Sequence, residues 1–569
     1  MPRTEQLDDS TNVPVLIAGA GPSGVLAALL LEQLGVETLL VERRQGPQRA
    51  PAAHVVNART FEVCRAAGVD AKVLADASRD PADAGYAYFV TKLGGRVLGR
   101  HLFEQQGDDQ LDVTPTPLRN ISQNDFEPIL LDTLRQRCGR SPLWQQQWEG
   151  ATQQGGEVLS RVRDLATGEE HEIASRYLLA ADGAGSRIRK GLGIPALGPE
   201  RIRSFVMIHF HAKLRGIPEV PPGALFFLSD PSTGGGAFVI HDLDREAVFM
   251  APFDPDQESI ETYTPERCDA LVRSGLEDPS LELSVQNISS WTMTAQVAEH
   301  YRAENIFLVG DAAHRFPPTG GLGLNTGAQD VHNLAWKLAA VLQGWAPESL
   351  LDSFEQERKP VAQWNADQSL RNALRLIEVP KALGIARPDA STEAMEALLA
   401  SPTGLAGVRE AVAQQAEHFD MPGLQLGFAY ESGALLRAQG EAPPGVPEVR
   451  NFVPSGAPGA RLPHAWLVES GDRRSLLDAV ALGSFLLVAG PDGKGWLDAA
   501  AAVDAVPLES LLLSRTELPD LDRWLQIAGI DADGALLVRP DQHVAWRARG
   551  LVSDPADELA RVLRAVLGA

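Results

Sequence analysis

The clearest hydrophobic pattern lies near the start of the chain. Residues 13–18 and 37–42 are short, mostly apolar runs, and residues 25–34 between them form a longer apolar run that ends at Gly35. Short apolar runs bounded by turn residues are typical of buried strands, and a longer run is typical of a buried helix. The order of strand, glycine-rich turn, helix and strand predicts the start of a parallel α/β sheet.

Three further runs in the middle of the chain favour a second sheet. Residues 205–214, 235–243 and 290–298 are rich in β-branched and aromatic side chains, which predicts strands of an antiparallel sheet. His209 and His211 fall on one face of the first of these strands, because alternate side chains of a strand point to the same side.

A fourth apolar run, residues 306–309, stops at an aspartate. Pro317 and Pro318 follow Asp311, then a glycine-rich turn, and then a helix that we predict over residues 325–342. A buried carboxylate is costly unless something donates a hydrogen bond to it. Asp311 therefore needs a partner, unless it lies in a solvent-exposed turn.

The last part of the chain has its own organisation. Residues 346–439 predict a helical segment, and proline and glycine gather in residues 440–464, which predicts a linker. Residues 465–569 predict a C-terminal domain of helices and strands, with a hairpin over residues 534–549.

Length and charge restrict the class of protein. A chain of 569 residues is too long for one core, so two to four domains are expected. The 51 basic and 75 acidic residues give a net charge of −24. Such a charge argues against nucleic acid or an anionic membrane as a partner.

Targeting and metal signals are weak. The first twelve residues are polar and lack the apolar core of a signal peptide, and the chain has no apolar run of about 18 residues that would predict a transmembrane helix. Cys64, Cys138 and Cys268 are far apart and show no metal-ligand spacing. We expect a soluble cytoplasmic protein with reduced thiols and no metal centre.

The N-terminal turn carries the first chemical motif. Gly19, Gly21 and Gly24 fit the spacing G-x-G-x-x-G between a strand and a helix. In dinucleotide-binding folds these glycines permit a tight turn, close approach of a pyrophosphate and helix–strand packing, and Glu42 is placed to bind a ribose hydroxyl. A glycine-rich turn without a ligand is the alternative, but the strand–turn–helix–strand–acid context favours dinucleotide binding. Since no second such unit is evident, we expect one tightly held dinucleotide.

Three motifs in this order resemble the flavoprotein aromatic hydroxylases, the family of para-hydroxybenzoate hydroxylase and phenol hydroxylase. They are the glycine motif with Glu42 and Arg43, the sequence AADGAGSRIR at residues 180–189, and residues 310–325. The sequences PAAHVVNARTFE and LQLGFAY look most like the branch of 2,4-dichlorophenol 6-monooxygenase and 2-hydroxybiphenyl 3-monooxygenase. The resemblance covers about residues 13–550 and implies that the dinucleotide is FAD.

The resemblance also implies roles for single residues. Asp311 would accept hydrogen bonds from the ribityl chain of FAD, and Pro318 would stiffen the loop beside the reactive face of the flavin. The cofactor-binding residues implied are Gly19, Gly21, Ser23, Gly24, Glu42, Arg43, Gln123, Asp182, Asp311, Pro318, Gly323, Leu324 and Asn325.

Two positions depart from the pattern of the branch. Relatives carry an arginine, thought to reach the FAD phosphates, where this chain has Ala52. Arg49 is a candidate replacement, with Arg43 and backbone groups as the alternative. Asn120 stands where many close relatives carry an aspartate, so a substrate role for that acid is in doubt.

The resemblance implies a fold class and a division of the chain. We expect an α/β protein with a Rossmann-type FAD-binding domain, an antiparallel-sheet substrate domain and a C-terminal thioredoxin-like domain. The FAD-binding domain would comprise residues 13–85, 110–200 and 300–345, and the substrate domain residues 86–109 and 201–299. No cysteine follows Cys268, so thiol chemistry is not expected in the C-terminal domain.

The activity implied is hydroxylation of a phenolic or other small aromatic substrate. In the family that this chain resembles, NAD(P)H reduces FAD, O2 forms a C4a-hydroperoxide, and its terminal oxygen attacks the ring. Pro318 would lie beside this chemistry, and His54 is the candidate base for the phenol, because imidazole titrates near neutral pH. A structural histidine that bonds a loop carbonyl is the alternative for His54.

Other candidate substrate contacts and functions are weaker. His209, His241 and Trp291 are candidates, although each could equally be a satisfied residue of the sheet or core. A halogenase of this fold usually carries W-x-W-x-I-P, which this chain lacks. A non-hydroxylating FAD oxidoreductase or redox-carrier flavoprotein is the alternative function, and a homo-oligomer is possible. The sequence distinguishes neither NADH from NADPH nor one phenol from another.

Overall fold

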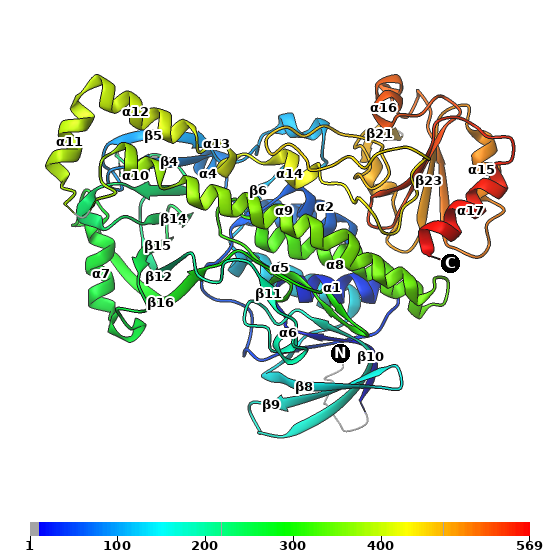
Figure 1. Ribbon diagram of the computed structural model, residues 1–569, viewed down its shortest axis with the longest axis horizontal. Helices are drawn as coiled ribbons and strands as arrows, with labels where there is room; N and C mark the ends of the chain where they lie inside the picture. Colours follow the sequence, from blue (N-terminus) through cyan, green and yellow to red (C-terminus); the bar gives the residue numbers. More distant parts are fainter. Residues whose placement is uncertain (1–10, 218, 388, 470, 569) are drawn as a thin grey trace.

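The computed structural model describes residues 11–217, 219–387, 389–469 and 471–568. Residues 1–10, most of the polar segment that argued against a signal peptide, lie outside the described residues. Figure 1 shows sheets and helices in three groups, with the N-terminal part below the long helices, a second sheet on the left and the C-terminal unit on the right.

The first sheet has the predicted parallel centre. Strand β1 (Asn12–Ala18) pairs in parallel with β2 (Thr38–Glu42) on one side and with β10 (Glu170–Ala180) on the other. Beyond β10 lies β19 (Ile306–Leu308), also parallel. The carboxyl ends of β1, β2 and β19 therefore meet at one edge, which is where an open α/β sheet binds its ligand.

Short or antiparallel strands complete this sheet. They are β7 (Leu143–Trp144), β8 (Gln146–Gln154), β9 (Glu157–Asp164) and β18 (Arg302–Ala303).

Long helices cover the first sheet. The predicted apolar helix is α1 (Pro22–Gln33), and it packs against α8 (Leu322–Leu342), which is buried along nearly its whole length. We predicted that α8 would start at residue 325, which was wrong by three residues. Gly321 takes the left-handed conformation at φ +62°, and the helix begins directly after it.

Other helices of this part are α2 (Ala58–Ala66), α3 (Ala71–Ala77), α4 (Pro81–Ala84), α5 (Gln123–Cys138), α6 (Arg187–Gly191) and α9 (Ser353–Arg375). Two short strands, β3 (Val55–Val56) and β6 (Arg119–Asn120), pair with each other beside α5.

The second sheet has seven strands, and it is antiparallel except for one parallel pair, β4 with β13. Its order is β16 (Leu283–Met293), β12 (Arg203–Ala212), β15 (Glu246–Phe253), β14 (Ala237–Asp242), β13 (Leu225–Leu228), β4 (Tyr86–Val90) and β5 (Val97–Leu102). One face carries the apolar core under α7 (Pro265–Ser274), and the other face turns toward the first sheet.

The single strand predicted over residues 290–298 was wrong. The chain leaves the second sheet after Met293, and β17 (Gln296–Ala298) joins a separate three-stranded sheet with β11 (Ala196–Leu197) and β20 (His314–Arg315). Ala295 N–H, which donates to the Pro199 carbonyl, holds the break between the two strands.

A helical segment crosses the top of the second sheet in Figure 1. It contains α10 (Glu378–Ala382), α11 (Thr392–Ala400), α12 (Pro402–Ala413) and α13 (Ala416–Phe419), and α14 (Pro422–Leu426) follows beside α2. Within residues 440–464 the structure has neither a helix nor an extended strand.

The C-terminal unit begins with the hairpin of β21 (Trp466–Glu469) and β22 (Asp472–Ser475) and continues as a four-stranded sheet. Along the chain come β23 (Phe485–Ala489), α15 (Lys494–Ala500), β24 (Leu508–Leu512), α16 (Leu521–Ala528), β25 (Ala535–Val538), β26 (Val544–Ala548) and α17 (Pro555–Leu567). The strand order is β24-β23-β25-β26, with β23 and β24 parallel and the other pairs antiparallel. The predicted hairpin, β25 with β26, is confirmed.

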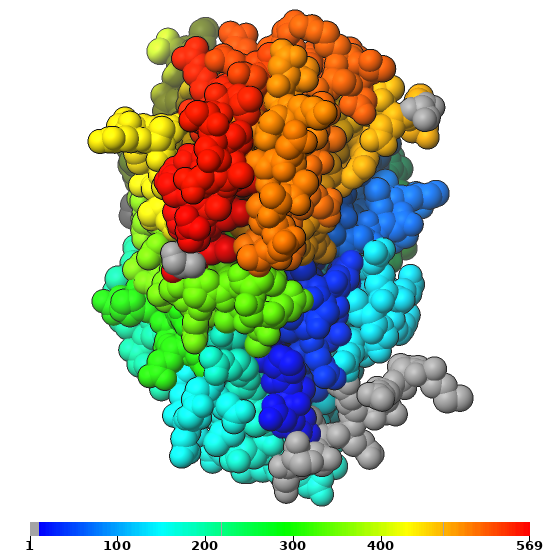
Figure 2. All heavy atoms as spheres, turned by 90° about the vertical axis from the view of Figure 1, so that its right-hand side faces the viewer, coloured from blue at the N-terminus to red at the C-terminus, as the bar shows by residue number. Residues whose placement is uncertain are grey.

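The C-terminal unit packs on the end of α8. Trp336 and Ala340 of α8 share an apolar cluster with Phe485 and Trp546. Figure 2 looks at this unit from outside and shows red α17 lying over the green segment that follows α8. Among the described residues, no helix is long and apolar enough to cross a membrane.

Candidate active site

A cavity of about 2150 Å³ lies between the first and second sheets. Ala18 and Val41, at the ends of β1 and β2, line it from one side, and Phe205 and Met250 line it from the second sheet. A site for one drug-sized ligand measures about 300–1,000 Å³. This cavity can therefore hold a dinucleotide and a second molecule together.

The glycine turn after β1 has the geometry that a pyrophosphate requires. At Gly19, with φ +108°, a Cβ atom would lie 2.2 Å from the Ala181 carbonyl oxygen, and at Gly24 it would lie 1.8 Å from the Gly19 carbonyl oxygen. At Gly21 a Cβ would meet no described atom within 4 Å, because this residue faces the cavity. Gly19 and Gly24 permit the close packing of the turn, and Gly21 leaves room for a ligand.

The start of α1 offers hydrogen-bond donors to the same space. Gly21 occupies the N-cap position, and no side chain of the described residues caps the helix. Ser23 lines the cavity next to it. Unpaired N–H groups at a helix N-terminus, with the positive end of the helix dipole, attract phosphate.

Glu42 is buried at the end of β2 and lines the cavity. Its Oε2 atom accepts a hydrogen bond from Ala20 N–H at 2.7 Å, and its Oε1 atom accepts one from Arg44 N–H at 2.9 Å. The carboxylate therefore fixes the glycine turn. Binding of a ribose by Glu42 stays a prediction.

Arg44 is a residue that the sequence reasoning missed. Its guanidinium lies 3.2 Å from Glu42 and 3.4 Å from Glu127 on α5, and it donates to the Ala20 carbonyl at 3.1 Å. Arg43 is exposed and lines the cavity.

Arg49, the candidate replacement for the arginine missing from the family pattern, does not line the cavity. Ala52 lines the cavity at that position, whereas Arg49 is exposed and is not part of the lining. Arg43 and Arg44 are the cations of this segment that reach the cavity.

Asp311 follows β19 in a turn that a buried ion cluster holds. Asp330 of α8 accepts a hydrogen bond from Gly310 N–H at 3.1 Å, and its carboxylate also pairs with His314 at 2.7 Å and Arg358 at 2.9 Å. This cluster fixes the backbone on which the Asp311 side chain is carried.

The Asp311 carboxylate itself has no hydrogen-bond partner among the described residues, and it lines the cavity. Asp311 is exposed to this space, while desolvation by the protein atoms around its carboxyl raises the pKa of that group; His314 and Arg315 act in the opposite direction. A carboxylate held in this way fits a ligand that donates hydroxyl groups.

The start of α8 provides a second set of free donors. Leu322, Gly323 and Leu324 line the cavity, and the helix has no side-chain cap within the described chain. Pro317 and Pro318 form the neighbouring wall.

Asn325 does not line the cavity with them. Its Oδ1 atom accepts from Asn57 N–H at 2.9 Å and from the Thr60 hydroxyl at 2.8 Å, and its Nδ2 atom donates to the Val55 carbonyl at 2.9 Å. The Asn325 side chain ties α8 to β3 and α2, and cofactor binding by Asn325 stays a prediction.

Asp182 and Gln123 lie at two other points of the lining. Asp182 Oδ2 accepts from Arg187 N–H at 2.7 Å and Ile188 N–H at 3.2 Å, and so caps α6. Its Oδ1 atom is buried without a partner in the described structure, and burial raises the pKa of this carboxyl. Gln123 begins α5 and donates to Glu127 at 2.7 Å.

His54 lies in the cavity wall just before β3. Its Nδ1 atom is 2.8 Å from Asn120 Oδ1, its ring stacks on Phe103 at 5.7 Å, and it meets the edge of His241 at 5.6 Å. Burial lowers the pKa of His54 to about 4, the Asn120 hydrogen bond opposes this, and Arg79 adds to it. The ring is therefore neutral at neutral pH.

The amide oxygen of Asn120 can only accept, so Nδ1 of His54 carries the hydrogen. The other ring nitrogen, Nε2, then has a free lone pair.

His241 and Trp291 line the cavity, as predicted for substrate contacts, but His209 does not. His241 is the extra residue of a β-bulge between β14 and β15, a distortion that commonly re-aims a side chain near an active site. Trp291 stacks on Phe205 at 6.2 Å. His209 is buried and hydrogen-bonds Glu246 at 2.8 Å.

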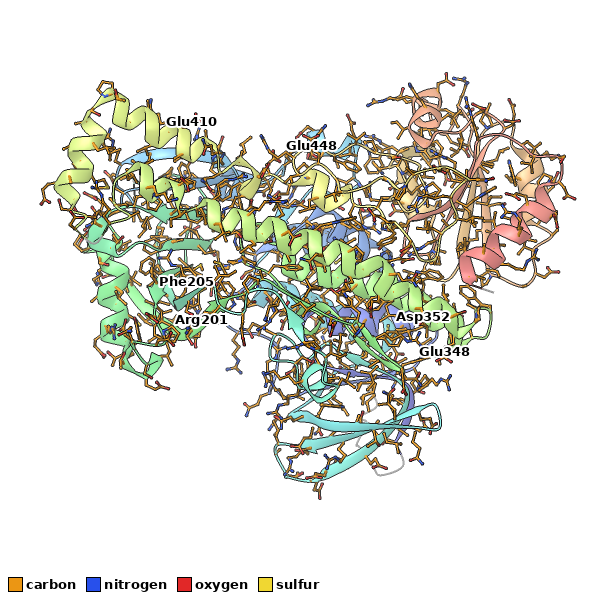
Figure 3. All side chains as sticks on the ribbon, viewed as in Figure 1. Arg201, Phe205, Glu348, Asp352, Glu410 and Glu448 are labelled. Atoms are coloured by element: carbon orange, nitrogen blue, oxygen red, sulfur yellow. The ribbon has the colours of Figure 1, made fainter. Side chains whose placement is uncertain are left out.

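The sequence reasoning also missed several arginines in the cavity lining. Arg201 and Phe205, labelled in Figure 3, lie where the chain enters β12, and the Arg203 guanidinium sits over the Phe205 ring at 5.5 Å. The lining arginines here are Arg187, Arg201, Arg203 and Arg315.

Comparison with protein families gives two matches. Residues 12–369 match the FAD binding domain, and residues 455–569 match the C-terminal domain of aromatic-ring hydroxylases.

Individual relatives match over nearly the whole chain. Tetracenomycin A2 monooxygenase-dioxygenase of Streptomyces glaucescens is 35% identical, over 98% of this chain and 97% of its own length. A 2,4-dichlorophenol 6-monooxygenase of Cupriavidus pinatubonensis is 32% identical, over 97% and 96%. The crystal structure of the flavin-dependent monooxygenase PieE in complex with FAD and substrate superposes with a TM-score of 0.89 at 33% identity, covering 99% of this chain and 100% of that one.

Proposed function

Because this chain belongs to the family of FAD-dependent aromatic-ring hydroxylases, we propose that it is a single-component monooxygenase that hydroxylates a phenolic substrate with NAD(P)H and O2. The observation that carries this proposal is the single cavity in which the dinucleotide turn, the unpaired Asp311 carboxylate and His54 meet.

The residues of the cavity fit FAD. Free N–H groups at the start of α1 suit the pyrophosphate, and Gly21 leaves the space for it. Asp311 has a free carboxylate that would accept from the hydroxyls of the ribityl chain, and the backbone N–H groups at Gly323 and Leu324, at the start of α8, would bind the flavin ring. Bound FAD would supply the oxygen-transfer chemistry, and the protein binds, orients and excludes water.

His54 receives the phenolic hydrogen in this proposal. A neutral imidazole with Nδ1–H fixed on Asn120 presents Nε2 as an acceptor to a hydroxyl in the cavity. Burial makes His54 a weak base on its own. A phenolate beside the ring would favour the protonated imidazole by charge pairing, so proton transfer is coupled to substrate binding.

The cavity volume favours a substrate larger than one ring. If the dinucleotide takes up to about 1,000 Å³ of the 2150 Å³, at least about 1,150 Å³ is left. Apolar side chains line this remainder, including Phe89, Phe103, Phe227 and Met250. We therefore propose a multi-ring phenol.

After the β21–β22 hairpin, the C-terminal unit follows the order β-α-β-α-β-β-α, and β23, the first strand of this order, lies inside the four-stranded sheet. This order supports the thioredoxin-like assignment and the predicted domain division, which we keep as proposals. The unit has no cysteine, so its role is packing and not thiol exchange. A homo-oligomer and a cytoplasmic location stay predictions.

A substrate screen tests the function. The FAD-loaded protein is mixed with single-ring and multi-ring phenols, and both NAD(P)H oxidation and hydroxylated product are measured. We expect stimulation and product, larger with multi-ring phenols. NAD(P)H oxidation that no phenol stimulates would favour the alternative, a redox-carrier flavoprotein.

A further inference from the structure

Two histidines and a glutamate meet on the second sheet outside the cavity lining. His209 and His211 lie on one face of β12, and Glu246 of β15 is the direct cross-strand partner of His211. One ligand atom from each of the three side chains lies within 4.8 Å of the other two. Among the described residues this is the one group of at least three such side chains with that geometry.

The sheet fixes this arrangement before any ligand arrives. His209 and Glu246 are buried, and His211 is half-buried. His209 Nε2 lies 2.8 Å from Glu246 Oε1, so these two groups already point at one another. Because all three come from paired strands, little backbone entropy is lost when they bind a common ion.

The charges around the group also favour a cation. The Asp125 carboxylate interacts electrostatically with Glu246 and with Asp242, which is the cross-strand partner of Glu246. Arg245 contacts the second oxygen of Glu246 at 3.3 Å and offsets part of this charge. The Arg79 guanidinium interacts electrostatically with the Asp242 carboxylate. Three carboxylates thus face two guanidinium groups, which leaves negative charge beside the two imidazoles.

We infer that His209, His211 and Glu246 form a binding site for a divalent transition-metal ion of the zinc type. Imidazole nitrogen and carboxylate oxygen are ligands that Zn²⁺ accepts, and three protein ligands leave a fourth position for water. Ligand atoms around a tetrahedral Zn²⁺ are about 3.4 Å apart, given bond lengths of about 2.0–2.1 Å. Small side-chain rotations therefore bring the three atoms to that spacing.

The site is separate from the proposed function, but it is close to it. His209 interacts electrostatically with His241, whose ring meets His54. The test uses metal binding and not turnover, so its failure would leave the hydroxylase proposal untouched.

The experiment measures Zn²⁺ binding to the FAD-loaded protein. Metal is first removed with a chelator, the chelator is removed by gel filtration, and Zn²⁺ is titrated in competition with a chromogenic chelator. Bound zinc is also counted by elemental analysis. We expect one Zn²⁺ per chain that is lost in His211→Asn.

The variants are chosen to separate this site from adventitious binding. Changes in surrounding residues already weaken metal sites by about 10–100-fold, so loss of a ligand in His211→Asn should weaken binding by at least that factor. Glu246→Gln preserves a hydrogen-bonding partner for His209 and should weaken zinc binding similarly. His300→Asn is the matched control, because His300 forms an exposed pair with Glu355 at 3.3 Å.

FAD content and melting temperature show whether each variant is folded. If His211→Asn does not fold, the zinc affinity of Glu246→Gln tests the inference. No stoichiometric zinc in the wild type would overturn the inference. Equal zinc affinity in the wild type and in a folded variant of either ligand would overturn it as well.

Discussion

His54 Nδ1 lies 2.8 Å from Asn120 Oδ1, at the point where β3 pairs with β6. The amide fixes the hydrogen on Nδ1 and the ring orientation, and it leaves Nε2 free in the cavity wall. If Nε2 takes the phenolic hydrogen, His54→Ala should slow hydroxylation by about a hundredfold to ten-thousandfold. FAD content should stay near normal.

The same variant should become uncoupled and form peroxide in place of product. A more acidic phenol needs less help, so the defect should shrink as the pKa of the substrate falls. The measurement is product formed per NAD(P)H oxidised over phenols of graded acidity. An equal defect at every acidity, with loss of flavin, would identify His54 as a structural residue.

Asn120→Asp should move the acid limb of the pH profile of hydroxylation to higher pH. In the wild type, burial lowers the pKa of His54 to about 4, so the ring is neutral through the neutral range. A carboxylate at this distance favours the imidazolium and raises the pKa of His54. The base is then lost as the pH falls through the raised value. The pH dependence of coupled hydroxylation tests this, with Asn124→Asp, at the second residue of α5, as the control. An unchanged acid limb in Asn120→Asp would contradict the prediction.

Asp311→Ala should weaken FAD binding. The carboxylate lines the cavity without a partner among the described residues, and in the proposed function bound FAD would donate to it. Removal of an acceptor from buried hydroxyls costs about 1–3 kcal/mol for each unsatisfied group, which corresponds to roughly a tenfold to hundredfold loss. Equilibrium dialysis of FAD gives the affinity, and Asp311→Asn, which keeps an acceptor, should lose less. Wild-type affinity in Asp311→Ala would exclude this role.

Local motifs were readable from the sequence, whereas long-range partnerships were not. The roles of Gly19 and Gly24 follow from a turn of six residues, and the structure places both as predicted. The side-chain contacts of Asn325 with Asn57 and Thr60 span more than 260 positions, and no local pattern announces them.

The same limit applies to ion pairs and metal ligands. Arg44 meets Glu127 from 83 positions away. His209 and His211 are close in sequence, but Glu246 joins them only through strand pairing, so spacing arguments predicted no metal centre. To predict a helix cap, an ion pair or a cross-strand ligand, the register of the sheets must be known.

Glu104→Gln should stabilise the protein, and more so at alkaline pH. Glu104 is buried with a backbone φ of +60°, and burial, with the Asp420 carboxylate, raises its pKa to about 8. The folded state therefore binds more protons than the unfolded state between about pH 4.5 and 8, so the carboxyl destabilises the fold increasingly as the pH rises through this window.

Gln removes the ionisation and can still bond Gln425. The measurement is the melting temperature of both proteins from pH 5 to 9, with Glu448→Gln, exposed and labelled in Figure 3, as the control. A difference between wild type and Glu104→Gln that does not grow with pH would refute the assignment.

Arg539→Met should destabilise the contact between the C-terminal unit and α9. The Arg539 guanidinium lies 2.7 Å from Glu357, which also binds Lys337 at 2.6 Å, and all three side chains are fully buried. Removal of one partner from a buried pair costs about 3–5 kcal/mol. Arg515→Met breaks the exposed pair with Asp522 and should cost less than about 1 kcal/mol. Denaturant unfolding of both variants provides the comparison, and equal losses would contradict the buried role.

The most direct test of the hydroxylase function follows the oxygen atom. The FAD-loaded protein, NAD(P)H and a multi-ring phenol are incubated under ¹⁸O2, and the product is analysed by mass spectrometry. We expect one ¹⁸O atom in a new ring hydroxyl for each product molecule, with NAD(P)H oxidation stimulated by the phenol. The account would be contradicted if neither single-ring nor multi-ring phenols stimulated NAD(P)H oxidation and the oxidation yielded only peroxide.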